Sequence, residues 1–260
     1  MFILDLRGKN KYKYLLGILG SLLIVFLIAI PIYTHGNYLV SKVTSNVRMV
    51  PIYSVDREDN VIAISFDATW GAEHTPAILD IMDKYKIKTT FFLVNIWLNE
   101  YPEMAKTIAS KGHEIGLHST THPHFSGLSE AEIKKELLDN YQMIKDITGY
   151  DAKLFRPPFG DYNNTSLRTI DNLGFTAIQW SVDSLDWKEL SASEIEERVL
   201  SRVKSGDIVL FHNNGTNTAE AVDHIIAALQ SKGFKIVPVS QVLLKGNTYI
   251  DFNGVQKLQD

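Results

Sequence analysis

Short apolar runs alternate with amphipathic segments over most of the chain, beginning at Val61. The apolar runs have the length and composition of buried strands, and they span residues 61–66, 88–94, 113–118, 152–156, 175–182, 206–212 and 234–239. The segments between them have helical spacing and mostly end at glycine, and they span residues 75–86, 101–112, 129–149, 164–174, 191–206 and 218–233. This alternation predicts an α/β domain of parallel strands covered by helices, either a barrel or an open doubly wound sheet.

The N-terminal region has a different pattern. Residues 14–34 contain no charged side chain, and a helix of that length crosses roughly 30 Å of hydrocarbon. Four basic side chains precede it, namely Arg7, Lys9, Lys11 and Lys13. The positive-inside rule therefore predicts a cytoplasmic segment over 1–13, a single-pass transmembrane anchor over 14–34 and a following domain on the extracytoplasmic side of the cell membrane. A cleaved signal peptide is the alternative.

The remaining chain divides into three parts. Residues 35–58 show no sustained period, which indicates a linker that packs loosely on the next domain. The alternating pattern places the main domain at 59–245. Residues 246–260 form a C-terminal tail, in which Asn253-Gly254 favours a small hairpin.

Composition narrows the chemistry of this 260-residue chain. Its formal net charge is −4, so it lacks the basic surplus that nucleic-acid binding requires, and nucleic acid is excluded as the expected partner. The chain has no cysteine. A metal ion would therefore be held by histidine, aspartate or glutamate side chains.

Polar side chains follow the predicted strands where each strand ends, and they are Asp67, His118, His122, Arg156, Asp183, Asp186 and His212. The carboxyl ends of parallel strands meet at one edge of a barrel or an open sheet, where active sites are built. The sequence therefore predicts that these side chains gather at one site.

Several of these residues suit particular chemistry. The spacing of His118 and His122 suits two ligands of a divalent ion such as zinc, presented by a loop because Pro123 follows; a pair of surface histidines is the alternative. Arg156, held between prolines and a glycine in RPPFG, can orient a carboxylate, or it forms an ordinary surface ion pair. His212 beside an acid such as Asp183 would be a proton donor, with a satisfied core histidine as the alternative.

Five segments, taken in order, resemble the motifs of the polysaccharide deacetylase family, the NodB-homology enzymes of carbohydrate esterase family 4. They are FDA, HSTTH, RPPFG, DSLDW and LFH, and the resemblance covers about residues 61–242. The N-terminal anchor and the wording SFDATWG are similar to the sporulation-associated PdaB-type branch. The resemblance implies a distorted (β/α)7 barrel, a divalent metal and removal of N-acetyl groups from peptidoglycan or chitin-like glycan.

The resemblance also implies roles for individual residues. It implies Asp67 as catalytic base, His118 and His122 as metal ligands, Arg156 as the residue that positions the base, Asp183 as the acid paired with the catalytic His212, and Leu210 as part of the acetyl pocket. Among the aromatic side chains beside the acids of WSVDSLDW, Trp187 is expected to bind substrate by stacking on a sugar face.

The chain departs from the family pattern at Ala68, where the family usually has a second, metal-binding acid. A catalytic zinc normally has three protein ligands, so two histidines leave the set incomplete. Asp67 could turn toward the metal, Glu73 could reach in, or water could complete the shell; Glu73 also reads as an acid before a helix. The leading hypothesis is an N-deacetylase. The alternatives are a glycan-binding protein with weak or lost catalysis and an O-deacetylase.

Overall fold

The computed structural model describes residues 19, 22–27, 29–30 and 48–259. The residues from Met49 onward form one compact unit. The predicted cytoplasmic segment lies outside the described residues, and so does most of the predicted anchor at 14–34, of which the described residues are helical. Searching the described residues for a helix of sufficient length and apolarity to cross a bilayer finds none.

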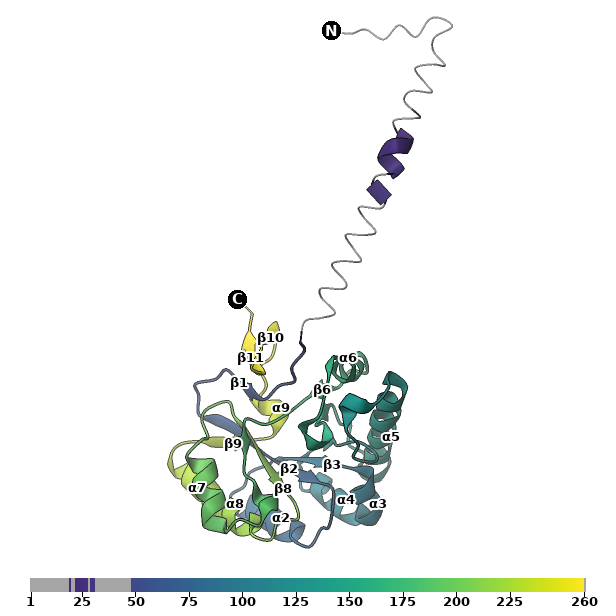
Figure 1. Cartoon of the computed structure of the whole chain (residues 1–260). Coiled ribbons are helices and arrows are strands. Elements are labelled where there is room, and N and C mark those ends of the chain that lie inside the picture. The colour runs from purple at the N-terminus through teal and green to yellow at the C-terminus, as the bar shows by residue number, and fades with distance from the viewer. Residues whose placement is uncertain (1–18, 20–21, 28, 31–47, 260) are drawn as a thin grey trace, which may run out of the picture. The chain divides into compact units, whose positions relative to one another are not determined.

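The main sheet of residues 48–259 has eight strands, and all of its pairings are parallel (Figure 1). The strand order is β6 (Thr176–Ala177), β5 (Leu154–Phe155), β4 (Glu114–Leu117), β3 (Thr90–Leu93), β2 (Val61–Ala68), β8 (Ile208–His212) and β7 (Val182–Asp183), and β9 (Lys235–Val237) pairs with β2. The parallel α/β prediction is confirmed. Central β2 pairs with three neighbours, because β9 pairs with its first residues (61–63) and β3 with its last (65–68), while β8 pairs with 63–67. All eight of its residues are buried, as expected for a central parallel strand.

One predicted strand, 175–182, is two separate strands. Its first part is β6 and its last residue begins β7, and these lie at the two ends of the strand order. Ile52 lies beside the break, where its N–H donates to the carbonyl of Ala177 (3.1 Å) and its carbonyl accepts from the N–H of Gln179 (2.7 Å). The sheet is therefore open between β6 and β7, and Ile52 takes up backbone bonds there that a continuous strand would have made.

Each of the six predicted helical segments contains a helix in the structure. The helices are α2 (Thr75–Lys84), α3 (Asn95–Glu100), α4 (Pro102–Ser110), α5 (Glu130–Thr148), α6 (Asn164–Asn172), α7 (Ala192–Leu200), α8 (Thr218–Ser231) and α9 (Val239–Val242). The short α3 and α9 were not predicted, because fewer than two turns give little periodic signal. Ser129, Asn163 and Ser191 begin α5, α6 and α7 with capping boxes, which satisfy amide groups that a helix start leaves free.

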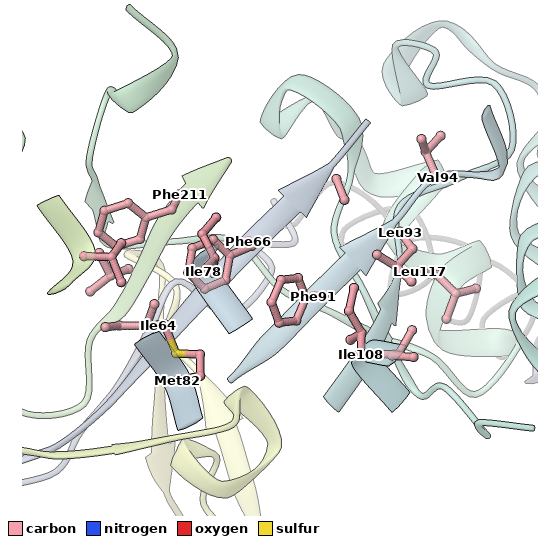
Figure 2. Close-up of a cluster of buried hydrophobic side chains, with 14 of the residues drawn as sticks. Ile64, Phe66, Ile78, Met82, Phe91, Leu93, Val94, Ile108, Leu117 and Phe211 are labelled. Carbon is pink, nitrogen blue, oxygen red and sulfur yellow. The ribbon is translucent and has the colours of Figure 1, made fainter. Parts of the chain in front are cut away.

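The core between sheet and helices is built on the alternation of β2. Ile64 and Phe66 face Ile78 and Met82 of α2, and the ring of Phe66 lies 5.0 Å from that of Phe91 (Figure 2). Because side chains alternate along a strand, Ser65 and Asp67 point to the other face. Burial of one face thus fixes the direction in which Asp67 points.

A second, three-stranded sheet joins the two ends of the described domain. It consists of β1 (Ser54–Val55), β11 (Val255–Leu258) and β10 (Thr248–Ile250), in that order. The prediction of a loose linker over 35–58 is wrong for its described end, because Ile52 and Val55 are each only 3% exposed and β1 pairs with β11. The predicted hairpin is confirmed, with Gly254 at φ +81° where a Cβ would meet Tyr53.

Candidate active site

A cavity of about 680 Å³ opens at the carboxyl ends of the strands. Seven of the eight predicted site residues line it, namely Asp67, His118, His122, Asp183, Trp187, Leu210 and His212. The eighth, Arg156, is fully buried behind Asp67. The tertiary structure therefore brings the predicted residues together, as expected for side chains that follow parallel strands.

Arg156 holds Asp67 in place from the closed side of the cavity. Its Nη1 donates to Asp67 Oδ1 at 2.7 Å, and its Nη2 donates to Ser65 Oγ at 2.8 Å. The guanidinium carbon also lies 4.1 Å from the centre of the Phe92 ring. Burial by itself would raise the pKa of Asp67, but the charge of Arg156, helped by that of His212, outweighs it and holds that pKa below its usual value. Asp67 is thus a buried carboxylate whose ionised form is favoured.

His118 faces Asp67 with a nitrogen lone pair. Its Nδ1 lies 2.7 Å from the carbonyl oxygen of Arg156, which can only accept, so Nδ1 carries the hydrogen. Burial lowers the pKa of His118 despite the charge of Asp67, which leaves Nε2 unprotonated. This Nε2 lies 3.5 Å from Asp67 Oδ2. Two acceptors facing each other across that distance fit a divalent cation between or beside them.

The loop that carries His122 is strained and clamped. Ser119 and His122 adopt positive φ values of 75° and 58°, which non-glycine residues rarely do. The Ser119 hydroxyl oxygen accepts from the N–H of His122, which ties the two ends of the loop together. The His122 ring lies 5.0 Å from that of His118. Burial, followed by the charge of His118, lowers the pKa of His122 to about 4, so this imidazole is also a neutral ligand candidate.

Two residues of α5 hold this loop, and sequence reasoning missed both. Glu136 Oε2 accepts from the N–H groups of Thr120 and Thr121, at 2.8 Å each. Asn140, which is fully buried, accepts from the N–H of His118 through Oδ1 and donates to the carbonyl of Leu93. The signal was a polar Asn140 at a core-facing position of a helix, which the periodicity of α5 would reserve for an apolar side chain.

His212 on the opposite wall is paired with Asp186, so the predicted pairing with Asp183 is wrong. His212 Nδ1 lies 2.8 Å from Asp186 Oδ1, and the other oxygen of Asp186 accepts from the His212 N–H and the Thr218 hydroxyl, at 2.7 Å each. Asp183 instead accepts from the N–H of Leu185. The reason is the left-handed conformation of Leu185 (φ 56°), which turns the chain so that the second acid points back toward β8.

The partner of His212 sets its protonation. Burial works to lower the pKa of His212, but the hydrogen bond and charge of Asp186, helped by the charges of Asp67 and Asp183, raise it above the usual value. The charged form of His212 is therefore favoured relative to a free imidazole, with Nε2 as the ring nitrogen left for the cavity. In register, His212 lies beside Asp67 on the neighbouring strand.

The side chains that could donate to a metal are the imidazoles of His118 and His122 and the carboxylate of Asp67. Among the described residues, no three histidine, aspartate or glutamate side chains form a group that could hold a metal ion. Ala68 is fully buried with the helix-facing core and does not line the cavity. The carboxylate of Glu73 lies over Gly71 and does not line the cavity either. Of the possible ligands, His118 Nε2 and Asp67 Oδ2 lie 3.5 Å apart, and the ring of His122 lies 5.0 Å from that of His118.

Exposed aromatic side chains line the mouth of the cavity. Trp70, Phe159 and Trp187 line it and are 55%, 61% and 55% exposed. His124 stacks on Phe159 at 4.4 Å and is not among the cavity-lining residues. Flat apolar rings beside polar groups are suited to the faces of sugar rings. Of the three, only Trp187 was predicted from the sequence.

Comparison with known proteins agrees with this geometry. Residues 54–178 match the family model "Polysaccharide deacetylase". A peptidoglycan-N-acetylglucosamine deacetylase of Bacillus cereus is 32% identical over 196 residues, which cover 74% of this chain and 92% of that protein. The chain spans only part of some relatives: an uncharacterized Bacillus subtilis protein, YlxY, is 31% identical over 74% of this chain and 60% of its own length.

One solved structure of the same fold is described as that of a pseudoenzyme. It is that of BA3943, described as a CE4 family pseudoenzyme from Bacillus anthracis, with a TM-score of 0.72 and 33% identity over 74% of this chain and 68% of that one. A mutant of BA3943 is described as having restored enzymatic activity. The chain is therefore similar in sequence to a named deacetylase and similar in fold to a protein described as a pseudoenzyme.

Proposed function

Because this chain belongs to the polysaccharide deacetylase family, we propose that it removes N-acetyl groups from amino-sugar glycan of the cell wall, with peptidoglycan as the substrate. One observation carries the proposal. An ionised carboxylate, Asp67, and a protonated histidine, His212, face the same cavity from neighbouring strands. Hydrolysis of an amide needs a base for the attacking water and an acid for the departing amine, and these two residues supply them.

The side chains of the site have separate tasks in this reaction. Asp67 takes a proton from water, and Arg156 keeps it ionised and oriented. His212 gives a proton to the amine nitrogen, and Asp186 stabilises the charged imidazole before that step. Leu210 lines the cavity where an acetyl methyl group would be held away from water, and Trp187 offers a face to the sugar ring.

A divalent ion such as zinc would be held by His118 and His122, with Asp67 Oδ2 adjacent. When bound, such an ion supplies a Lewis acid for the acetyl oxygen. The neutral state of both imidazoles supports this assignment, because a protonated ring cannot ligate a metal.

We also propose the cellular setting. The uncharged run at 14–34, preceded by four basic residues, supports a single-pass anchor with the domain on the extracytoplasmic side, where cell-wall glycan lies. The sequence SFDATWG supports a place in the sporulation-associated PdaB-type branch. Membrane fractionation with protease protection tests the first point, and spore formation in a deletion strain of the source bacterium tests the second.

The test of the main proposal is acetate release. The purified full chain is incubated with N-acetylglucosamine oligomers, peptidoglycan and acetylated xylan, with zinc or cobalt added. Release from the amino-sugar glycans, abolished in Asp67→Asn, is the expected result. Release from xylan alone would make the chain an O-deacetylase, and no release from any of them would refute the proposed activity.

A second candidate is a glycan-binding protein with little or no catalysis, and Ala68 is the observation that favours it. The experiment compares the chain with Ala68→Asp for zinc affinity by calorimetry, for acetate release and for oligosaccharide binding. A chain that binds oligosaccharide but neither binds zinc nor releases acetate, together with an Ala68→Asp variant that does both, would establish this second function. Zinc-dependent acetate release by the unmodified chain would refute it.

A further inference from the structure

The exposed large apolar side chains of residues 48–259 fall into two groups and one isolated residue. The first group is the aromatic mouth of the cavity, for which the proposed glycan substrate accounts. The isolated residue is Leu138 on α5. The second group lies on the hairpin of β10 and β11, and its members are Tyr249 (46% exposed), Ile250 (41%), Phe252 (84%) and Leu258 (58%). The proposed reaction has no use for this second group.

The hairpin exposes apolar side chains in more than one direction. Phe252 is in the turn, and the register pairs Tyr249 with Lys257 and Thr248 with Leu258. Because side chains alternate, Tyr249 and Leu258 point to opposite faces of the hairpin. A flat protein partner would cover one of these faces. A lipid interface surrounds an inserted hairpin tip, and it therefore fits this distribution better.

The charges of the hairpin do not favour an anionic or a cationic partner. Lys257 forms an ion pair with Asp251 at 3.2 Å, so the two cancel close to the apolar side chains. A surface of paired charges with Phe and Tyr side chains resembles the interfacial anchors of membrane-associated proteins, in which aromatic rings lie at headgroup level. Apolar burial then provides the attraction, and lipid charge is secondary.

The hairpin lies where the chain enters the domain. β1 is the first strand after the N-terminal region and pairs directly with β11 (Figure 1). Between the end of the uncharged run at Thr34 and Ser54, the chain can extend over at most about 70 Å, so an anchored chain keeps β1 and the hairpin within reach of the bilayer.

The hairpin also lies at the end of the domain opposite the cavity. Ser54 of β1 forms a bridge with Asp207, which directly precedes β8, whereas His212 at the other end of β8 lines the cavity. A domain that rests on the membrane through the hairpin would therefore open its cavity away from the lipid, toward the cell wall.

We propose that the β10–β11 hairpin is a membrane-docking surface, with Phe252 and its apolar neighbours inserted in the lipid interface. This inference rests on the proposed anchor and extracytoplasmic location. It assigns the hairpin the role of orienting the domain, so that the aromatic mouth faces the glycan.

The absence of cysteine makes a direct test possible, because one introduced thiol can be labelled without background. Phe252→Cys and Leu138→Cys are made in the full chain, labelled with the environment-sensitive dye NBD and reconstituted in phosphatidylcholine vesicles. The label at 252 is expected to shift its emission to the blue and to be quenched by nitroxide lipids. The label at 138, an exposed apolar site on a helix away from the hairpin, is expected to show neither effect.

The same samples separate the possible failures. Equal behaviour of the two labels, or crosslinking of position 252 between copies of the chain with no lipid quenching, would overturn the docking surface. Retention of the chain in the vesicles and acetate release are recorded in parallel. If both persist while position 252 stays in water, only the hairpin inference fails. If the chain does not remain with the vesicles, the anchor and the inference that depends on it both fail.

Discussion

The two walls of the cavity carry the same residue type in opposite protonation states. On one wall, His118 and His122 have lowered pKa values because burial disfavours the charged ring. On the other, His212 is only partly buried, with 25% of its side chain exposed, and its pKa is raised. The difference is the partner: His118 Nδ1 is held by a carbonyl, whereas His212 Nδ1 is held by the carboxylate of Asp186.

This contrast shows that burial alone does not decide what a histidine can do. A buried imidazole held by a neutral acceptor stays neutral and keeps a lone pair for a metal. A buried imidazole held by a carboxylate keeps its proton and can act as an acid. Asp67 lies between the walls, and it is ionised because Arg156 supplies the charge that burial would otherwise make costly.

Removing the charge between the walls is expected to have the largest effect. Asp67→Asn takes away the proposed base and should lower acetate release by about 10²- to 10⁴-fold. It also leaves the buried Arg156 without its partner, at a cost of about 3–5 kcal/mol in the free energy of unfolding. Both are measured, by acetate assay and urea denaturation, with Asp183→Asn as the control that retains the Arg156 pair. Unchanged stability would contradict the buried ion pair.

Replacing Asp186, the partner of His212, should lower the pKa of His212 toward those of His118 and His122. Asp186→Asn removes the carboxylate that stabilises the protonated imidazole of His212. The pKa of His212 should therefore fall, and the alkaline limit of activity should move to lower pH. Asp183→Asn should shift both far less, because that carboxylate bonds Leu185. Histidine titration by NMR in metal-free protein distinguishes the two variants. A larger shift in Asp183→Asn would restore the pairing expected from the sequence.

Loosening the first wall should weaken metal binding without changing the second. Glu136→Gln loses the carboxylate that holds the amides of Thr120 and Thr121, and supporting contacts of this kind typically account for 10- to 100-fold in metal affinity. We expect about a tenfold loss of zinc affinity in competition titrations, with the pKa of His212 unchanged. Glu132→Gln, on the same helix but bonded to Ser129, is the matched control. Equal losses in the two variants would indicate a general effect on the helix.

The smallest expected effect concerns a histidine outside the cavity. It tests whether burial alone lowers a histidine pKa in this protein. His113 is buried away from the cavity, and burial, followed by the charge of Lys88, lowers its pKa to about 4. His113 has a pKa near 6.5 in the unfolded chain and about 4 in the folded chain. Between these pH values the unfolded chain binds a proton that the folded chain does not, so the free energy of unfolding falls as pH falls from 6.5 toward 4. Between pH 7 and 5 this histidine should contribute a loss of about 2 kcal/mol.

The measurement is urea denaturation of the chain and of His113→Gln at both pH values. The variant should show the weaker pH dependence by that amount, since glutamine can accept the bond from the N–H of Thr89 but does not titrate. Parallel pH dependence in the two proteins would show that the lowered pKa belongs to other histidines.

Sequence periodicity predicted the elements of the fold where they are long. α5 and α8 extend over several turns and β2 over eight residues, so apolar spacing and caps identify them locally. The glycines that end helices could also be predicted from the sequence, as Gly149 after α5 shows with its left-handed φ of 72°. The run at 175–182 was misread because its two halves pair with different neighbours, and nothing in a continuous apolar stretch records that change.

For the site, the sequence by itself determined which side chains follow the strands, and hence that Asp67, His118 and His212 would meet. It could not determine that Asp186 and not Asp183 pairs with His212, since a single left-handed residue, Leu185, decides which acid points inward. Nor could it reveal that the backbone of Ile52 bonds to Ala177 and Gln179 at the edge of the sheet. Local spacing fixes the elements because their hydrogen bonds and buried faces repeat within a few residues. Hydrogen-bond partners distant along the chain depend on turns and packing that exist only once the whole domain has formed.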